Sequence, residues 1–388
     1  MTLVRRIGTL LLAPALAVAI AVVISAVVMG LLGVDPLQVL KVMVDLGDTP
    51  TQQVTAVIAI LNRSLPLFLA GLAVAIGFRM SLFNIGVEGQ YRMATIMAAT
   101  VGAAVALPGP LHVLLIIVVA MAVGAIWAGI VAVLKVTRGV SEVISSIMLN
   151  TIALGLASYL LTGPFRGSPD GASVVSTAEI SESGRIGGLN GILDVFGLVN
   201  PPRQLYGFLP IAVVVGIVIW VLLQRTRFGF DLRATGLSPS AASASGVDAR
   251  RMVVKTMLIS GAVAGLIGLP DLLGRTYEYN SDFTSGLGFL GIAVALLGRN
   301  NPGGIALAAV LYAFLDRAAV PLQAASLPSS VVTIIQGTIV LAVVVANEIA
   351  RRVSRQAAER SSRQTSGPVT EGSVTTGPVP ATASEGTS

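Results

Sequence analysis

Long apolar stretches separated by short polar segments dominate this chain. They lie near residues 8–31, 54–77, 87–107, 112–134, 141–162, 207–224, 253–270, 285–298, 303–320 and 329–347. A helix needs roughly 20 apolar residues to cross a bilayer, and most of these stretches come close to that length. The eighth is short and rich in glycine. The pattern predicts an all-α integral membrane protein with about ten transmembrane helices.

Composition supports the membrane assignment and excludes two other classes. Only 11% of the residues are charged, 54% are hydrophobic and the mean hydropathy is +0.86. A soluble domain with so few charges could not cover its surface. The net charge of +6 does not indicate nucleic acid, because the cations lie at the ends of apolar runs, where membrane orientation requires them. We therefore predict a lipid bilayer as partner and no nucleic acid.

The distribution of cations also predicts an orientation. With the N-terminus inside, the cytoplasmic segments hold most of the 25 Lys and Arg residues, as the positive-inside rule requires. The sequence thus predicts a multi-pass protein of the inner (cytoplasmic) membrane with both termini cytoplasmic. The N-terminal run resembles a signal peptide, but its apolar core continues to about Leu32. Signal cores span roughly 7–15 residues, so we interpret this run as the first spanning helix.

The same pattern divides the chain into segments. Residues 1–350 are predicted to form one transmembrane domain, with a long external loop at 163–206 and a cytoplasmic loop at 225–252. The external loop is equally a landing surface for a partner or a plain connector. Residues 351–388 consist mainly of Ser, Thr, Gly, Pro and Val and are predicted to be a disordered cytoplasmic tail.

Signatures of catalysis are not found in the sequence. None of the three lysines follows a glycine, so the chain has no P-loop and is not itself predicted to hydrolyse ATP. The GxGxxG match at 286–291 lies in an apolar stretch without a βαβ context, and close helix packing explains its glycines better. The same applies to Gly261 and Gly265. The chain has no Cys, and the single His112 is interpreted as an ordinary residue. We predict no catalytic residue, no metal site and no cofactor on this chain.

Polar residues interrupt two apolar stretches at 81–94. Such groups are costly in a membrane unless they face a cavity or other protein. Asn84 stands before a helix start, where its side chain could cap exposed amides. Glu88 is placed in the first turn, where the helix dipole favours an anion, and Arg92 follows at i+4 as a partner. The segment is therefore either part of a functional cavity or a capped helix end with a local ion pair.

A second polar segment lies in the predicted cytoplasmic loop. Residues 233–247 combine small residues with flanking arginines. A short helix along the membrane surface here would fit a groove on a soluble partner. A solvated turn explains the same residues equally well.

Three motifs in this order resemble one family. Phe83-Asn-Ile-Gly-Val-Glu-Gly-Gln90 resembles the signature of ATP-binding-cassette (ABC) importer permeases of the branched-chain amino acid, simple sugar and nucleoside group, and is most similar to the nucleoside branch. Ser141-Glu-Val-Ile-Ser-Ser-Ile-Met-Leu-Asn150 resembles the second hallmark of that branch. The segment from Arg233 to Gly246 resembles its coupling loop, with Ser240 where Glu is usual in importer permeases.

The resemblance implies a type II ABC importer permease fold, in which helices 2–5 and 7–10 form an inverted repeat. It implies a permease pair, here a heterodimer with a second homologous permease. Each permease docks on an ABC ATPase subunit, which carries ATP and Mg, and an external substrate-binding lipoprotein delivers the small-molecule substrate. The implied function is ATP-driven import by alternating access, with nucleosides as substrate.

Site residues follow from these motifs and from the expected spans. We expect small and polar groups of spans 2, 3, 5, 8 and 9 to line the substrate path, with candidates Asn62, Asn84, Glu88, Gln90 and Asn150. A nucleoside offers hydroxyls and base edges that suit such side chains, although each could instead pack helices together. The residues expected to couple to the ATPase are Arg233, Gly236, Pro239, Ala241, Ala242 and Gly246.

Other functions stay open at this point. Within the importer class, simple sugars and branched-chain amino acids are alternative substrates. An ATP-independent secondary transporter would need carboxylates at membrane depth, and the sequence places Glu88 and Glu142 only near span ends. A membrane scaffold without transport function is disfavoured by the polar interruptions.

Overall fold

The computed structural model describes residues 33–191, 201–324 and 330–338, with single positions between 23 and 31 and at 341 and 345. These residues form helices joined by turns and extended segments, and one β-bridge pairs Ser176 with Asn280. The helical elements are α2 (Pro36–Val44), α3 (Pro50–Phe78), α4 (Val87–Ala104), α5 (Gly109–Arg138), α6 (Glu142–Thr162), η1 (Glu182–Gly184), α8 (Leu209–Arg225), α9 (Arg227–Leu237), α10 (Pro239–Ala244), α11 (Ala249–Gly265), α12 (Leu269–Asp271), η2 (Leu272–Thr276), α13 (Leu287–Leu297) and α14 (Pro302–Ala324).

Several helices are long and apolar enough to cross a membrane. Within the described residues these are α3, α5, α6, α14 and the continuous stretch Ala249–Thr276, which joins α11, α12 and η2. A further candidate is the pair α8 and α9, which is bent by 66°. By contrast, α13 has 11 residues and is about 16 Å long, roughly half of the hydrocarbon thickness. It can therefore begin or end inside the membrane.

The predicted all-helical membrane protein is confirmed. Every apolar stretch expected between residues 54 and 320 contains a helix. The stretch expected at 8–31 lies mostly, and the tail at 351–388 wholly, outside the described residues, whereas residues 330–338 of the stretch expected at 329–347 are described and helical. The count of ten spans, the inverted repeat and the domain limits therefore stay predictions.

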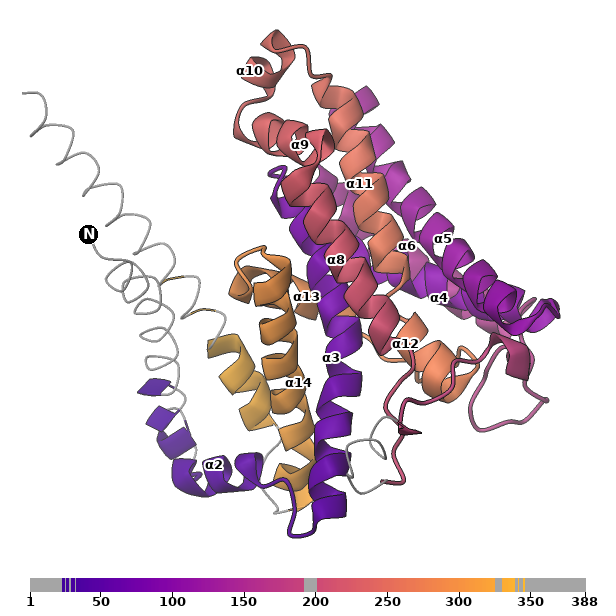
Figure 1. The fold of residues 1–388 in the computed structure, drawn as a ribbon, viewed down its shortest axis with the longest axis vertical. Coiled ribbons are helices and arrows are strands. Elements are labelled where there is room, and N and C mark those ends of the chain that lie inside the picture. The colour runs from indigo at the N-terminus through magenta and orange to yellow at the C-terminus, as the bar shows by residue number, and fades with distance from the viewer. Residues whose placement is uncertain are drawn as a thin grey trace, which may run out of the picture.

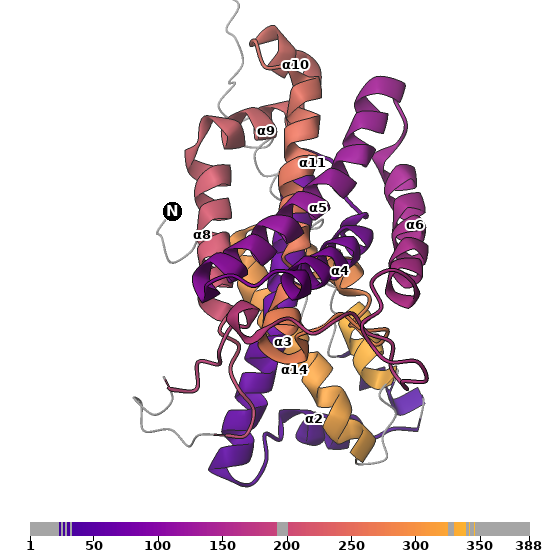
Figure 2. The same cartoon turned by 90° about the vertical axis from the view of Figure 1, so that its right-hand side faces the viewer.

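Helix α3 forms the centre of the bundle. Its residues from Leu65 to Gly77 are almost all buried. Helices α4, α5 and α6 lie on one side of it, and α2 and α14 lie on the other (Figures 1 and 2). The central position of α3 means that groups along its length contact segments that are far apart in the sequence.

Glycines bring α5 and α11 into backbone contact. A Cβ at Gly124 of α5 would overlap the Gly261 carbonyl of α11, and a Cβ at Gly265 would overlap the Ala120 carbonyl of α5. Small residues permit such close crossings in membrane proteins. The close helix packing predicted for Gly261 and Gly265 is thereby confirmed.

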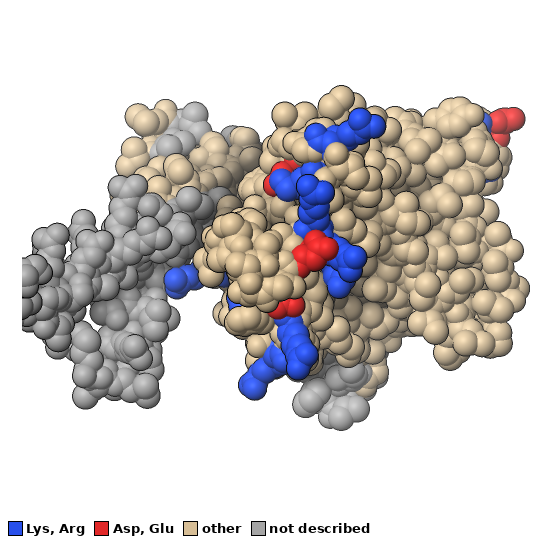
Figure 3. Space-filling model, turned by 90° about the horizontal axis from the view of Figure 1, so that it is seen from above, with Lys and Arg blue, Asp and Glu red and all other residues tan. Residues whose placement is uncertain are grey.

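Basic side chains gather at one end of the molecule, the end that carries α9 and α10 (Figure 3). We call this end the basic face. Its exposed cations include Arg225, Arg227, Arg250, Arg251 and Lys255. This clustering is what the positive-inside rule predicts for a cytoplasmic surface.

We predict that Gly265→Leu disrupts the crossing of α5 and α11. Overpacking costs about 1–3 kcal/mol where side chains can move, and here the obstacle is backbone, so the loss should reach or exceed that range. Thermal unfolding of the detergent-solubilised protein measures it. The control is Gly155→Leu on α6, where a Cβ would meet nothing within 4 Å. Equal destabilisation by both variants would contradict the packing argument.

Candidate functional site

The polar segment predicted at 81–94 begins in a break between two helices. Helix α3 ends at Phe78 and α4 begins at Val87. Between them Ser81 adopts a left-handed backbone conformation with φ 58°. We call residues 79–86 the break. It ends at the start of α4, which places Glu88 in the first turn of that helix.

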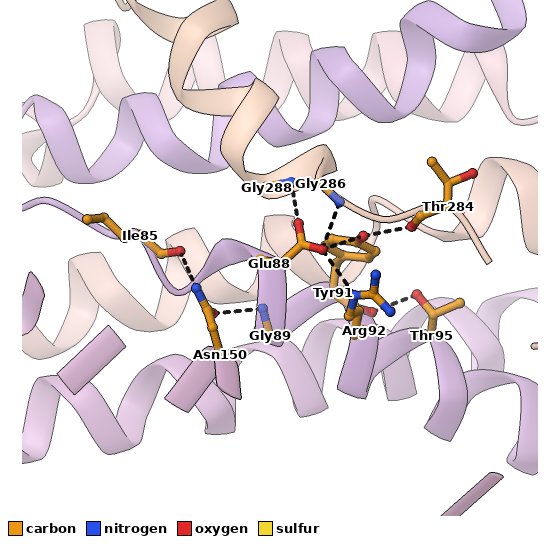
Figure 4. Close-up of polar contacts among 10 residues, drawn as sticks. All are labelled: Ile85, Glu88, Gly89, Tyr91, Arg92, Thr95, Asn150, Thr284, Gly286 and Gly288. Atoms are coloured by element: carbon orange, nitrogen blue, oxygen red, sulfur yellow. Dashed lines mark hydrogen bonds and ion pairs between the residues drawn. The ribbon is translucent and has the colours of Figure 1, made fainter. Parts of the chain in front are cut away.

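Glu88 is the centre of the polar contacts around the break (Figure 4). Its Oε1 accepts hydrogen bonds from the Gly286 amide at 2.9 Å and from Arg92 Nε at 3.0 Å. Its Oε2 accepts from the Gly288 amide at 3.0 Å. The Tyr91 hydroxyl lies 3.1 Å from Oε1 and 2.8 Å from the Thr284 carbonyl oxygen. The ion pair predicted between Glu88 and Arg92 is therefore confirmed.

The carboxylate joins the N-termini of two helices. It belongs to the first turn of α4, and its amide donors precede and open α13. Both helix dipoles favour a negative charge at this point. The approach is close, since a Cβ at Gly288 would overlap the backbone of Glu88. Gly286 has φ 83°, a conformation that glycine adopts at little cost. The GxGxxG match thus reflects helix packing, as predicted.

Asn84 and Gln90 form a reciprocal amide pair. Gln90 Nε2 donates to Asn84 Oδ1 at 2.9 Å, and Asn84 Nδ2 donates to Gln90 Oε1 at 3.1 Å. Asn84 Nδ2 also donates to Ser260 Oγ on α11, and that hydroxyl donates to the Ala73 carbonyl of α3. The predicted capping by Asn84 is wrong. The N-cap of α4 is Gly86, which has no side-chain cap, and Asn84 instead connects the break to α3 and α11.

Asn150 of α6 contacts the end of the break and the first turn of α4. Its Oδ1 accepts from the Gly89 amide at 2.9 Å, and its Nδ2 donates to the Ile85 carbonyl at 3.0 Å. The side chain is half-buried. The predicted path residues Asn84, Glu88, Gln90 and Asn150 thus lie together around the break.

Asn62 lies elsewhere on α3. Its Nδ2 donates to the Gln204 carbonyl at 2.8 Å, and its Oδ1 accepts from the Tyr206 amide at 2.9 Å. Both polar atoms therefore hold the segment that leads into α8, and the structure does not bring Asn62 to the break.

The segment predicted to couple to an ATPase contains a short capped helix, one of the two alternatives that the sequence left open. Ser238 Oγ accepts from the Ala241 amide at 3.3 Å, and Pro239 occupies the first turn of α10. Gly246 ends the turn in a left-handed conformation with φ 85°. Pro at the start and Gly after the end are typical of helix termini. Ala241 is exposed, whereas Ala242 is buried against the protein.

Helix α9 connects this segment to the break. A Cβ at Gly236 would come within 2.8 Å of the Arg79 carbonyl oxygen and the Met80 Cα. Ser81 Oγ donates to the Gly236 carbonyl at 2.9 Å. Arg233 donates to the Leu223 carbonyl at the end of α8. The predicted coupling residues and the predicted path residues are therefore joined through residues 79–81.

An intramembrane ion pair was not predicted. Arg63 of α3 donates through Nε to Asp316 of α14 at 2.8 Å. The carboxylate also accepts from Gln336 at 2.7 Å. Asp316 lies within α14, and this acid was not considered alongside Glu88 and Glu142 in the sequence. An Arg in the middle of an apolar helix was the signal, because such a charge needs a partner.

Comparison with known proteins places this arrangement in a family. Residues 56–344 match the family described as "Branched-chain amino acid transport system / permease component". No solved structure matches. The chain belongs to this permease family. It is thus a permease subunit of an ABC transporter, a multi-pass transport component and not an enzyme.

Curated relatives agree on the class and differ in substrate. The guanosine ABC transporter permease protein NupP of Bacillus subtilis is 38% identical, covering 71% of this chain and 77% of that protein. The glucose ABC transporter permease protein TsgB13 of Haloferax volcanii is 32% identical, covering 84% and 85%. The nucleoside ABC transporter permease protein NupB of Lactococcus lactis is 28% identical, covering 86% and 90%.

We predict that Glu88→Gln destabilises the protein and impairs transport. An amide can accept on one atom only, so it would present N–H groups to N–H donors and leave Arg92 without its counter-ion. Removing one partner of a buried pair costs about 3–5 kcal/mol. Glu142→Gln is the control, because Glu142 also opens a helix and pairs with Lys135 at 2.5 Å. It should lower the unfolding temperature less. Wild-type stability and uptake of Glu88→Gln would contradict the role in joining α4 and α13.

Proposed function

We propose that this chain is one of two membrane-spanning subunits of an ATP-driven importer of nucleosides. It forms part of the translocation path and transmits movement from a separate ATPase. The proposal rests on the contact between α9 and residues 79–81, because that contact connects a surface segment suited to a partner with the polar break inside the bundle.

In this mechanism α10 is the docking element. Its exposed residues and the neighbouring exposed side chains of Phe230 and Leu237 offer apolar surface on the basic face. A short capped helix that projects from the bundle suits a groove on a soluble partner. When ATP closes the partner ATPases, α10 and α9 move, and Gly236 carries that movement to the break.

The buried polar residues in the break and in the first turns of α4 connect the helices that border the path. Asn84, Glu88 and Gln90 are at most 8% exposed and bond to neighbouring groups. Because their hydrogen bonds are occupied, we propose that they set the positions of α4 and α13, which border the path. Asn150 is more exposed and has a second lone pair for cargo.

Nucleosides are proposed as the substrate from the motif and from the relatives named for guanosine and nucleosides. Simple sugars are the second candidate, because a glucose permease is similar over most of both chains. The heterodimer is supported by a second set of similar permeases, NupQ of Bacillus subtilis and NupC of Lactococcus lactis, each 26% identical.

The remaining parts of the assembly follow from this class. The family implies an ABC ATPase and a substrate-binding partner. We propose that ATP and Mg bind to the ATPase chain and that the substrate-binding partner is an external lipoprotein. We place the subunit in the inner (cytoplasmic) membrane with the basic face and both termini on the cytoplasmic side.

Reconstitution tests the proposal. The test uses liposomes that contain this chain, its second permease and the ATPase. They should take up guanosine only when ATP is on the side of the membrane that carries the ATPase and the binding protein is on the outside. Excess glucose should not compete. Uptake without nucleotide would exclude the ABC mechanism, and competition by glucose alone would assign the sugar substrate instead.

We predict that Gly246→Val uncouples ATP hydrolysis from uptake. A β-branched residue is strained at φ 85° by about 1–2 kcal/mol, which would change the end of α10 while leaving the transmembrane bundle intact. Gly139→Val is a matched control, because Gly139 also has positive φ and open space but ends α5. The measurement is the ratio of nucleoside taken up to ATP hydrolysed. An unchanged ratio for Gly246→Val would remove α10 from the coupling path.

A further inference from the structure

A wide, open cavity lies at the end of the molecule opposite the basic face. Its volume is about 1150 Å³, and it is bordered by α2, the first half of α3, the second half of α14 and residues 202–203. Ligand cavities commonly measure about 300–1,000 Å³. A nucleoside would therefore fit with room for water.

Most of the lining is apolar, but charged side chains interrupt it. Val42, Leu46, Ala59 and Val320 contribute apolar surface, and Arg63 and Asp316 lie among them. Ionisable residues within membrane-spanning helices are costly and usually mark a substrate pathway or pair with one another. Here the two side chains pair and also keep about a quarter of their surface exposed, 28% for Arg63 and 25% for Asp316.

Residues of α14 and of the segment after it fix the Arg63–Asp316 pair in position. Asp316 Oδ2 accepts from Arg63 Nε at 2.8 Å, and Oδ1 accepts from Gln336 Nε2 at 2.7 Å. Gln336 is held in turn, since its carbonyl accepts from the Tyr312 hydroxyl at 3.3 Å. The orientation of the carboxylate is therefore fixed before any ligand arrives.

Both charged groups retain hydrogen-bonding capacity. A guanidinium has five N–H donors and a carboxylate about four lone-pair sites. Among the contacts of the described residues, Arg63 uses only Nε, and Asp316 accepts two bonds. The cavity thus presents free donors next to free acceptors on a pair that has no net charge.

We propose that Arg63 and Asp316 bind the adjacent ribose hydroxyls of a nucleoside in this cavity. Each hydroxyl both donates and accepts, so a vicinal diol can donate to Asp316 and accept from Arg63 without separating the two charges. A zwitterionic amino acid would need to pull them apart. The apolar lining accommodates the base. This assignment rests on the proposed nucleoside substrate.

The test compares guanosine with its 2′,3′-dideoxy analogue in the complete reconstituted transporter. The wild type should take up guanosine about ten- to hundredfold faster than the analogue, because hydrogen bonds to charged groups contribute a free energy that corresponds to about that factor. Asp316→Asn should remove most of this preference at the same binding-protein concentration. Arg317→Gln is the control, because Arg317 borders the same cavity but donates to the Asp45 carbonyl. It should retain the preference.

Other variants separate ligand binding from helix packing. Arg63→Lys keeps the charge and should fold, but with fewer donors it should also lose preference for the diol. The double exchange Arg63→Asp with Asp316→Arg retains an ion pair between α3 and α14. If Asp316→Asn lowers guanosine uptake and the exchange restores it, while the preference for guanosine over the dideoxy analogue is the same in all three proteins, the pair is only a helix contact and the assignment is overturned. An Asp316→Asn variant with unchanged preference would overturn it too.

The two proposals fail differently. If the wild-type assembly takes up no guanosine with ATP, the proposed function is wrong. If it takes up guanosine and the dideoxy analogue equally well, the importer proposal stands and the diol site is wrong.

Discussion

The structure depends on one buried carboxylate at which two helices begin. Glu88 accepts amides from the start of α13 while it belongs to the first turn of α4. Inside a membrane, free helix ends are costly because water is not there to satisfy their amides. One anion offsets that cost for both helices, so α4 and α13 can both start within the bundle. The relative position of α4 and α13 is thereby fixed by a few directed bonds.

A short series of contacts connects α9 and α10 at the surface with Glu88 inside the bundle. Gly236 packs on the backbone of Arg79 and Met80, and the chain then runs through Asn84 to Glu88. Over this short distance the contacts are backbone packing or fixed hydrogen bonds, which transmit displacement better than flexible side chains. Arg79 extends the link, because its side chain donates to the Asn300 carbonyl in the turn between α13 and α14. Arg79 therefore connects α9 both to the segment that leads into α4 and to the turn after α13.

Local sequence patterns were sufficient to predict part of the fold and of the candidate site. Apolar stretches located the helices, and the spacing of Glu88 and Arg92 gave their ion pair. The small residues at 233–247 allowed a short helix or a solvated turn, and α10 forms there with Pro239 in its first turn and Gly246 after its end. Contacts between distant segments could not be obtained this way. The partners of Glu88 in α13 are backbone amides, which carry no sequence signal, and Asn84 was assigned to a local cap although its partner Ser260 lies on α11. Asp316 was overlooked as the partner of Arg63 because nothing local joins α3 to α14.

One labelling experiment tests most directly whether α9 is connected to α13 through residues 79–80 and Glu88. The chain has no Cys, so Ser285→Cys introduces a unique thiol at an exposed position just before α13. In the assembled transporter, its rate of modification by a small thiol reagent should change several-fold when ATP binds. Gly236→Leu, which separates α9 from residues 79–80, should abolish that nucleotide dependence while the labelled protein stays folded. A nucleotide-dependent rate that persists in Gly236→Leu would show that the signal reaches Glu88 and α13 by another route.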